Sequence, residues 1–250
     1  MTGLPPRLMA MARDERKLTG ERVRREEHRW PVVVALLVAM GLFLTLPSTF
    51  LPAFRYTVVG IGLVVLVPLI VVNPVRFQHQ TRWSRRLSIA ETLLLLAANQ
   101  VALVLLVDHL VYGDGISGRR LLVSAAQVWV TNVIAFAMLY WEIDRGGPVA
   151  RSMGHVQSRR TDLRFPNDDA GRADVPHLAS APAPHVASTP APWRPDFLDY
   201  LFTSLWTSTA FSPTDAMPLT RRMKALMALE SVSGLLIFAL VIGRSVNLFQ

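Results

Sequence analysis

The chain of 250 residues contains no cysteine. This absence excludes a disulfide framework, a thiolate metal site, an iron–sulfur cluster and a cysteine nucleophile. Charged residues are also scarce, at 18% against 51% hydrophobic residues, whereas a soluble domain usually carries about 25% charged residues. A soluble domain would spread its apolar residues over short amphipathic runs. This chain gathers them into long blocks and places the charges between the blocks.

Enzyme signatures are missing as well. No Ser/His/Asp arrangement, phosphate-binding glycine loop or metalloprotease motif occurs in the sequence. None of the six histidines lies centrally in an apolar block, which argues against a haem held by histidines of two membrane helices. We therefore expect no enzymatic activity, no catalytic residue, no metal site and no cofactor.

The net charge of +8 raises the question of nucleic-acid binding. The arginines lie in the segments between apolar blocks, where membrane topology alone accounts for them. We therefore expect the lipid bilayer as the partner, and no nucleic acid.

Four apolar blocks occupy the first part of the chain, at residues 31–46, 56–72, 87–107 and 121–141. Each approaches the roughly 20 residues that a helix needs to cross a bilayer. Helices are expected because lipid offers no partner for exposed backbone groups. With the C-terminal segments described below, the sequence predicts an all-α integral membrane protein, a helical bundle of five to six membrane segments including one short or re-entrant half-helix.

The basic residues predict how the bundle is organised and oriented. Residues 1–29 form a charged tail with eight Arg and Lys, residues 30–142 a four-helix membrane region, residues 143–195 a Pro/Ala-rich linker, and residues 196–250 a C-terminal unit. The segments between blocks alternate between many and few basic residues. This alternation predicts a multi-pass protein of the plasma (inner) membrane, with the N-terminus and the linker in the cytoplasm.

The C-terminal unit begins with a short apolar stretch, residues 197–211, which contains Asp199. Its length is small for a full crossing and fits a re-entrant or half-membrane helix better. A turn-rich stretch and a last span, residues 223–248, follow. If residues 197–211 instead cross fully, Arg221, Arg222 and Lys224 would lie outside, against the positive-inside rule.

A hydroxyl-rich segment joins the short helix to the last span. Its candidate pore-loop residues are Thr207, Ser208, Thr209, Ser212, Pro213, Thr214 and Asp215. Such an arrangement could direct a half-helix and bare carbonyls at an ion, as selectivity filters do. The alternative is a short hydrophobic hairpin packed on its neighbours, with Pro213 and Pro218 ending helices.

This segment resembles pore-loop cation channels of the two-span potassium-channel type. Residues 209–215 stand at the position of their Thr-Val-Gly-Tyr-Gly-Asp filter, and Gly234 falls mid-helix, where such channels often bend. Both filter glycines are missing, so the resemblance implies a pore loop without potassium selectivity. One short pore segment cannot enclose a channel, so a pore would require a homo-oligomer.

The C-terminal half also resembles a family of bacterial multi-pass membrane proteins of unknown function. Three stretches carry this resemblance: residues 141–148 (WEIDRGGP), 162–166 (DLRFP) and 209–220 (TAFSPTDAMPLT). Within the first stretch, the acidic residues and Arg145 could bind a cation or form an interfacial ion pair, and the following Gly-Gly-Pro reads as a helix stop.

Four polar side chains lie within the predicted spans, namely Glu91, Asn99, Gln127 and Glu230. Carboxyl groups inside a membrane are costly and usually face the bundle interior or water. Glu91 and Glu230 could form a proton or cation pathway, or the polar residues could make interhelical hydrogen bonds. The leading functional hypothesis is an ion-conducting membrane protein, and the alternatives are a non-conducting scaffold or assembly protein and a secondary transporter.

Overall fold

The computed structural model of the chain describes residues 30–46, 52–72, 82–112, 118–152, 161–168, 193–209 and 216–248. The predicted N-terminal tail, residues 1–29, lies outside the described residues. So do residues 169–192 of the predicted linker and residues 210–215 of the candidate pore loop.

The described residues are almost all helical, which confirms the all-α fold. The main helices are α2 (Trp30–Thr45), α3 (Pro52–Val72), α4 (Arg82–Tyr112), α5 (Gly118–Ile143), α8 (Phe197–Thr209) and α9 (Arg221–Leu248). Each coincides with one predicted apolar segment. Most extend beyond it, because a helix continues from its apolar part into the polar residues that flank it.

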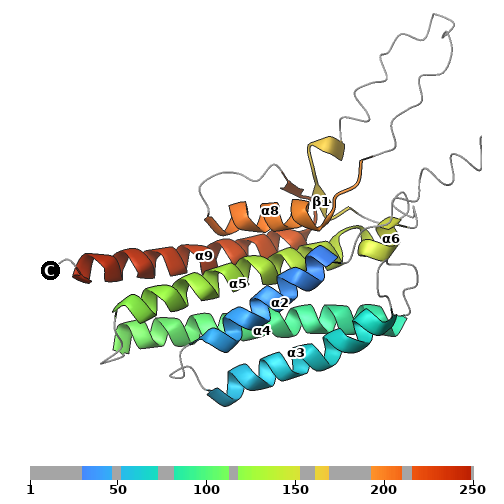
Figure 1. Ribbon diagram of the computed structural model, residues 1–250. Coiled ribbons are helices and arrows are strands. Elements are labelled where there is room, and N and C mark those ends of the chain that lie inside the picture. Colours follow the sequence, from blue (N-terminus) through green and yellow to red (C-terminus); the bar gives the residue numbers. More distant parts are fainter. Residues whose placement is uncertain are drawn as a thin grey trace, which may run out of the picture.

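Helix α5 forms the centre of the bundle (Figure 1). It packs against α2, α4, α8 and α9, while α3 lies on the outer side of α2 and α4. Every residue of α5 from Thr131 to Glu142 is buried. A helix that is apolar around its whole circumference requires neighbours on all sides, so the composition of α5 explains its central position.

Three described helices are long and apolar enough to cross a membrane. They contain the spans Arg85–His109, Gly118–Gly146 and Arg221–Gly243. Two shorter apolar stretches, Trp30–Thr45 and Arg55–Val64, accompany them. These helices are consistent with a membrane protein, whereas the expected count of five to six segments remains a prediction.

Helix α8 runs antiparallel to α5 and parallel to α9. Ser204 lies beside Glu230, and four residues later Ser208 lies beside Gly234. Residue numbers therefore increase in the same direction along α8 and α9. With 13 residues, α8 is about 20 Å long and α9, with 28 residues, about 42 Å. Gly234 is the midpoint of α9, so α8 starts near the same end of the bundle as α9 and stops halfway along it (Figure 1).

The bundle end at which α8 begins, called here the entry end, carries the remaining elements. Helix α5 is followed there by a 3₁₀ turn η1 (Asp144–Gly146) and by α6 (Pro148–Ser152). Two short strands, β1 (Leu163–Arg164) and β2 (Met217–Pro218), pair antiparallel with Leu163 opposite Pro218. This pairing holds the start of α9 against residues 161–168.

The predicted linker is therefore shorter than residues 143–195. Arg145, Arg151, Asp162 and Leu163 all fall in that range, and all four are buried at the entry end. The apolar residues Leu163 and Phe165 indicate from the sequence that residues 161–167 could dock on the bundle, whereas nothing in the sequence indicates burial of Arg145 and Arg151. Their burial depends on the partners that the bundle supplies.

Candidate functional site

Two polar clusters lie along α8. The entry cluster lies at the start of α8 and consists of Asp144, Arg145, Arg151, Asp162, Tyr200, Thr220 and Arg222. The mid-bundle cluster lies further along α8 and consists of Tyr140, Ser204 and Glu230. The entry cluster joins η1, α6 and Asp162 to α8 and the start of α9, and the mid-bundle cluster joins α5, α8 and α9, so the two fix α8 at two depths.

The Asp144 carboxylate is the centre of the entry cluster. It is fully buried and accepts hydrogen bonds from the backbone N–H groups of Asp162 (2.9 Å) and Leu163 (3.1 Å). The Tyr200 hydroxyl donates a third bond at 2.6 Å, and Arg145 Nε lies 3.2 Å from Asp144 Oδ2. Asp144 and Arg145 thus form an ion pair, and both side chains are buried.

A left-handed turn brings Asp144 into this position. Arg145, Gly146 and Gly147 have φ angles of 53°, 82° and 92°, in the region that glycine adopts without steric cost. The predicted helix stop is thus confirmed, since α5 ends at Ile143. Because the chain reverses here, the carboxylate of Asp144 faces residues 162 and 163.

Arg151 is fully buried beneath this turn. Its Nη1 donates to the carbonyls of Trp141 (2.8 Å) and Asp144 (2.9 Å), which are among the last carbonyls of α5 and its turn. Its guanidinium carbon lies 5.1 Å from the ring centroid of Tyr200, within cation–π range. Arg151 therefore caps the end of α5 and at the same time contacts α8.

Asp162 connects the entry cluster to α9. Its carboxylate is fully buried and accepts from Thr220 Oγ1 (2.6 Å) and from Arg222, whose Nε lies 2.8 Å away and whose Nη2 binds the other oxygen. The backbone carbonyl of Asp162 accepts from the N–H of Leu219 at 2.8 Å. The start of α9 is thus bound through its side chains and its backbone.

The entry cluster unites parts of all three stretches that carry the family resemblance. Asp144 comes from residues 141–148, Asp162 from residues 162–166 and Thr220 from residues 209–220. Segments far apart in the sequence therefore meet around two buried carboxylates. Both carboxylates have their hydrogen bonds satisfied by the protein, which favours a structural clamp over an open binding site.

The start of α8 has its own cap. Asp196 Oδ1 accepts from the backbone N–H groups of Leu198 (2.9 Å) and Asp199 (3.3 Å), and Asp199 Oδ2 accepts from the N–H of Asp196 (2.7 Å). This reciprocal arrangement is a capping box. It accounts for Asp199, whose charge lies at the first turn of α8, where the helix dipole stabilises an anion.

The mid-bundle cluster surrounds the carboxyl group of Glu230, which is fully buried near the middle of α9. The Tyr140 hydroxyl donates to Glu230 Oε2 at 2.5 Å, and Ser204 Oγ is within hydrogen-bonding distance of Glu230 Oε1. Ser204 Oγ also lies 2.8 Å from the carbonyl oxygen of Val133. One carboxyl group thus joins α5, α8 and α9 about one helical turn before the midpoint of α9.

A cluster of amide side chains from α4 and α5 contacts α9 one turn beyond Glu230. Ser233 donates to Gln100 Oε1 at 3.1 Å, and Asn132 Oδ1 accepts from Asn99 (2.9 Å) and Gln100 (3.1 Å). Among the described residues, Asn99 Oδ1 and Asn132 Nδ2 have no hydrogen-bond partner although both residues are buried. Interhelical hydrogen bonding therefore accounts for most of the polarity at Asn99, as one of the two sequence hypotheses expects.

The candidate pore-loop residues divide into two groups. Thr207, Ser208 and Thr209 form the last turn of α8, and their hydroxyls donate to carbonyls of the same helix, those of Thr203, Leu205 and Trp206. Ser212, Pro213, Thr214 and Asp215 lie outside the described residues. The contribution of the turn to a pore thus remains a prediction.

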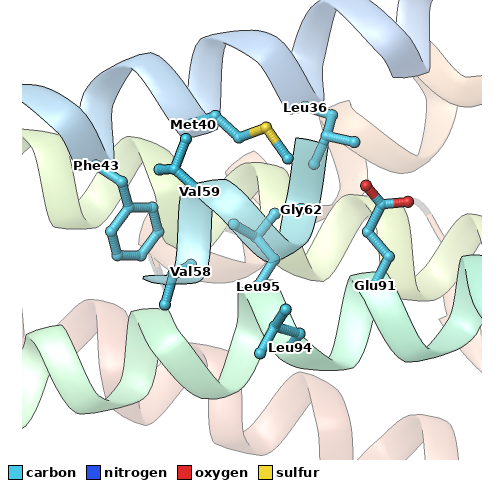
Figure 2. Close-up of a pocket in the computed structure, with 9 residues that line it drawn as sticks. All are labelled: Leu36, Met40, Phe43, Val58, Val59, Gly62, Glu91, Leu94 and Leu95. Carbon is cyan, nitrogen blue, oxygen red and sulfur yellow. The ribbon is translucent and has the colours of Figure 1, made fainter. Parts of the chain in front are cut away.

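Glu91 and Gln127 lie apart from α8. Gln127 donates to Thr45 of α2 at 2.8 Å, toward the opposite end of the bundle. Glu91 borders a small, partly open pocket between α2, α3 and α4 (Figure 2). The other lining residues are apolar: Leu36, Met40, Phe43, Val58, Val59, Gly62, Leu94 and Leu95. Glu91 and Glu230 thus have different neighbours, and a proton or cation pathway that uses both remains a prediction.

Sequence reasoning missed Tyr140, Ser204 and Tyr200 as partners. One signal was present: Tyr200, Ser204 and Ser208 recur every four residues and so share one face of α8. All three are fully buried. Nothing in the sequence alone indicated that Asp144 and Glu230 lie against this face.

Comparison of the chain with known protein families, with curated proteins and with solved structures finds no match.

Proposed function

We propose that the chain is a membrane protein in which α8, residues 210–215 and the start of α9 act as a pore loop, and that several copies together conduct cations. The observation that carries this proposal is the placement of α8. It enters beside the start of α9, ends halfway along it, and the chain then returns to the entry end at Ala216. A helix that ends at mid-depth and a chain that returns to its starting side are the geometry of a pore loop.

The electrostatics of α8 support a cation. The C-terminal end of a helix carries a partial negative charge, and here that end lies at half the depth of an apolar bundle. Thr207, Ser208 and Thr209 surround this end with hydroxyl groups. Half-helices in membrane proteins are used in this way to bind ions at mid-depth.

The distribution of arginines supports an orientation. Arg85, Arg86, Arg194, Arg221 and Lys224 lie at the entry end, whereas Arg55, Arg119 and Arg120 lie at the opposite end. By the positive-inside rule the entry end faces the cytoplasm of a cell with a plasma (inner) membrane. The proposal therefore comprises five crossing helices, a half-helix that enters from the cytoplasm, and a C-terminus on the outer side.

A second chain is required to close a pore. Only 22% of the apolar window of α9 is buried within one chain, so most of its surface is available to lipid or to another copy. Its outward residues include Ala225, Ala228 and Ala239, and small residues permit close helix contact in membranes. A homo-oligomer that meets along α9 would place the ends of several α8 helices around one axis.

The test is cation flux into liposomes that contain the purified protein. Wild-type protein is expected to conduct, and Thr209→Ala, Ser212→Ala and Asp215→Asn to reduce the flux. Asp108→Asn is the matched control, because Asp108 is exposed near the opposite end of α4. Flux that is unchanged in the Thr209, Ser212 and Asp215 variants would end the proposal.

The orientation has a separate test, a dual topology reporter fused after Gln250. An outside signal is expected, since α9 begins at the entry end. A cytoplasmic signal would refute the arrangement with five crossings and an entry from inside.

A non-conducting scaffold is the second candidate. The observation in its favour is that the α8 hydroxyls and the entry cluster are bonded within the chain. A stable complex with another membrane protein, without cation flux, would favour the scaffold. Thermal stabilisation by a small solute would instead favour a secondary transporter.

A further inference from the structure

Glu230 is a carboxyl group without a basic partner. It is fully buried, and among the described residues no Lys, Arg or His lies within ion-pairing distance of it. An uncompensated carboxylate inside an apolar bundle costs several kcal/mol. The site must therefore hold either a neutral acid or a bound cation.

The groups that face Glu230 provide no charge. Helix α5 contributes the Tyr140 hydroxyl and α8 the Ser204 hydroxyl, and the amide of Gln100 on α4 accepts from Ser233, three residues further along α9. Two other titratable groups of α5 and α8 have partners elsewhere: Tyr200 donates to Asp144, and Glu142 accepts from Ser88. Tyr140 is thus the titratable group in contact with Glu230.

The contacts of Ser204 decide between a proton and a metal cation. Its hydroxyl oxygen lies within hydrogen-bonding distance of two oxygens, the carbonyl of Val133 and Oε1 of Glu230. A serine hydroxyl has one proton to donate, and a carbonyl can only accept. The two contacts are separate two-centre hydrogen bonds when Ser204 donates to Val133 and Glu230 donates to Ser204, an arrangement that requires a proton on Glu230.

A metal cation fits the site less well. Alkali and alkaline-earth cations take about six or more oxygen ligands, and no group of three or more His, Asp or Glu side chains occurs in the described part of the chain. With the proton in place, every oxygen of the cluster has a partner: Tyr140 donates to Oε2, Glu230 to Ser204, and Ser204 to Val133.

We infer that Glu230, Tyr140 and Ser204 form a proton-binding site that holds α8 against α5 and α9, and that loss of the proton releases the inner half of α8. Ionisation would leave Ser204 with two acceptors for one proton and would leave a buried anion. Water stabilises that anion, so deprotonation favours separation of α8. The consequence for conduction rests on the proposed function: α8 leads directly into residues 210–215, so protons would regulate the pore loop.

Infrared spectroscopy of the full chain in lipid bilayers tests the proton directly. At neutral pH the wild type is expected to show the carbonyl stretch of a buried protonated acid, and Glu230→Gln is expected to lose it. Asp108→Asn should retain it. Tyr140→Phe keeps the acid but removes one hydrogen bond, so the band should shift in frequency. A wild-type spectrum without the band, or a band unchanged in Glu230→Gln, overturns the inference.

Cysteine labelling tests the link to α8. The chain has no cysteine, so Ser208→Cys introduces its single thiol at a buried position on α8. As the pH rises, the labelling rate of Ser208→Cys should increase several-fold more than the labelling rate of the Ser208→Cys/Glu230→Gln double variant. The double variant is the control for ionisation of the thiol itself. Equal pH dependence in both backgrounds would refute the coupling. Neither measurement requires conduction, so absent flux would refute the pore and leave the proton site intact.

Discussion

The close contact between Gly234 and α8 yields the sharpest prediction. A Cβ atom at residue 234 would overlap the carbonyl oxygen of Ser208 and lie 2.9 Å from its carbonyl carbon and 3.1 Å from its Cα. These are backbone atoms, so no side-chain rotation relieves the overlap. The nearest atom, the Ser208 carbonyl oxygen, lies 2.0 Å from the added Cβ. Carbon–oxygen contacts lie at about 3.3–3.6 Å, so Gly234→Ala requires this part of α8 to move by roughly 1.3–1.6 Å.

This movement has a calculable cost. Overpacking of a well-packed interior costs about 1–3 kcal/mol, and the shift also strains the hydrogen bond from Ser231 to the carbonyl of Thr207 (3.2 Å) and the contact between Ser204 and Glu230. In an unhindered helix the same exchange is favourable by roughly 0.5–1 kcal/mol. Gly243→Ala is the matched control, because nothing lies within 4 Å of its added Cβ.

Thermal unfolding of the purified variants measures the difference. At roughly 2–4 °C per kcal/mol for a chain of this size, Gly234→Ala should melt lower than wild type, while Gly243→Ala should melt at the same temperature or higher. If Gly234→Ala is as stable as Gly243→Ala, the close approach of α8 to α9 is wrong. The half-depth position of α8, on which the pore-loop proposal depends, would then be lost.

Three further predictions concern the polar contacts. Arg222→Ala leaves the buried carboxylate of Asp162 with one side-chain donor, so it should lower the free energy of unfolding by about 1–3 kcal/mol, although the Arg222 side chain is 60% exposed. The control Arg221→Ala, at an adjacent exposed position, should change that free energy by no more than about 0.5 kcal/mol in the same unfolding assay. Arg151→Lys should not restore the stability lost in Arg151→Ala, because one ammonium cannot reproduce the planar guanidinium contacts. A melting temperature of Arg151→Lys close to that of the wild type would contradict this. A double-mutant cycle of Asn99→Ala and Asn132→Ala should give a coupling of about 0.6–1.7 kcal/mol, and a value near zero would show that their hydrogen bond contributes nothing.

The two polar clusters suggest a division of roles along α8. At the entry end, Asp144 and Asp162 have cationic or backbone donors and are fully satisfied, which fixes the start of the helix. At mid-depth, Glu230 has only hydroxyl partners, so its attachment depends on protonation. A helix held firmly at one end and conditionally at the other can change its inner end while its entry point stays in place.

The sequence alone determined the helices and their apolar character. Runs of about 20 apolar residues have few alternatives to a membrane helix, so hydropathy alone predicted α4, α5 and α9. The steric freedom of glycine predicted the turn at Gly146 and Gly147. The short length of α8 was also readable, because the residue count limits how far a helix reaches.

Only the tertiary structure decided what α8 contacts. Hydropathy carries no information about which faces meet, so the parallel packing of α8 on α9, the overlap at Gly234 and the convergence of Asp144, Asp162 and Arg222 were not accessible from the sequence. The same limit applies to Glu230. Its position within an apolar helix was visible, but the hydroxyls of Tyr140 and Ser204 come from helices 90 and 26 residues away, and only the folded bundle brings them to one carboxyl group.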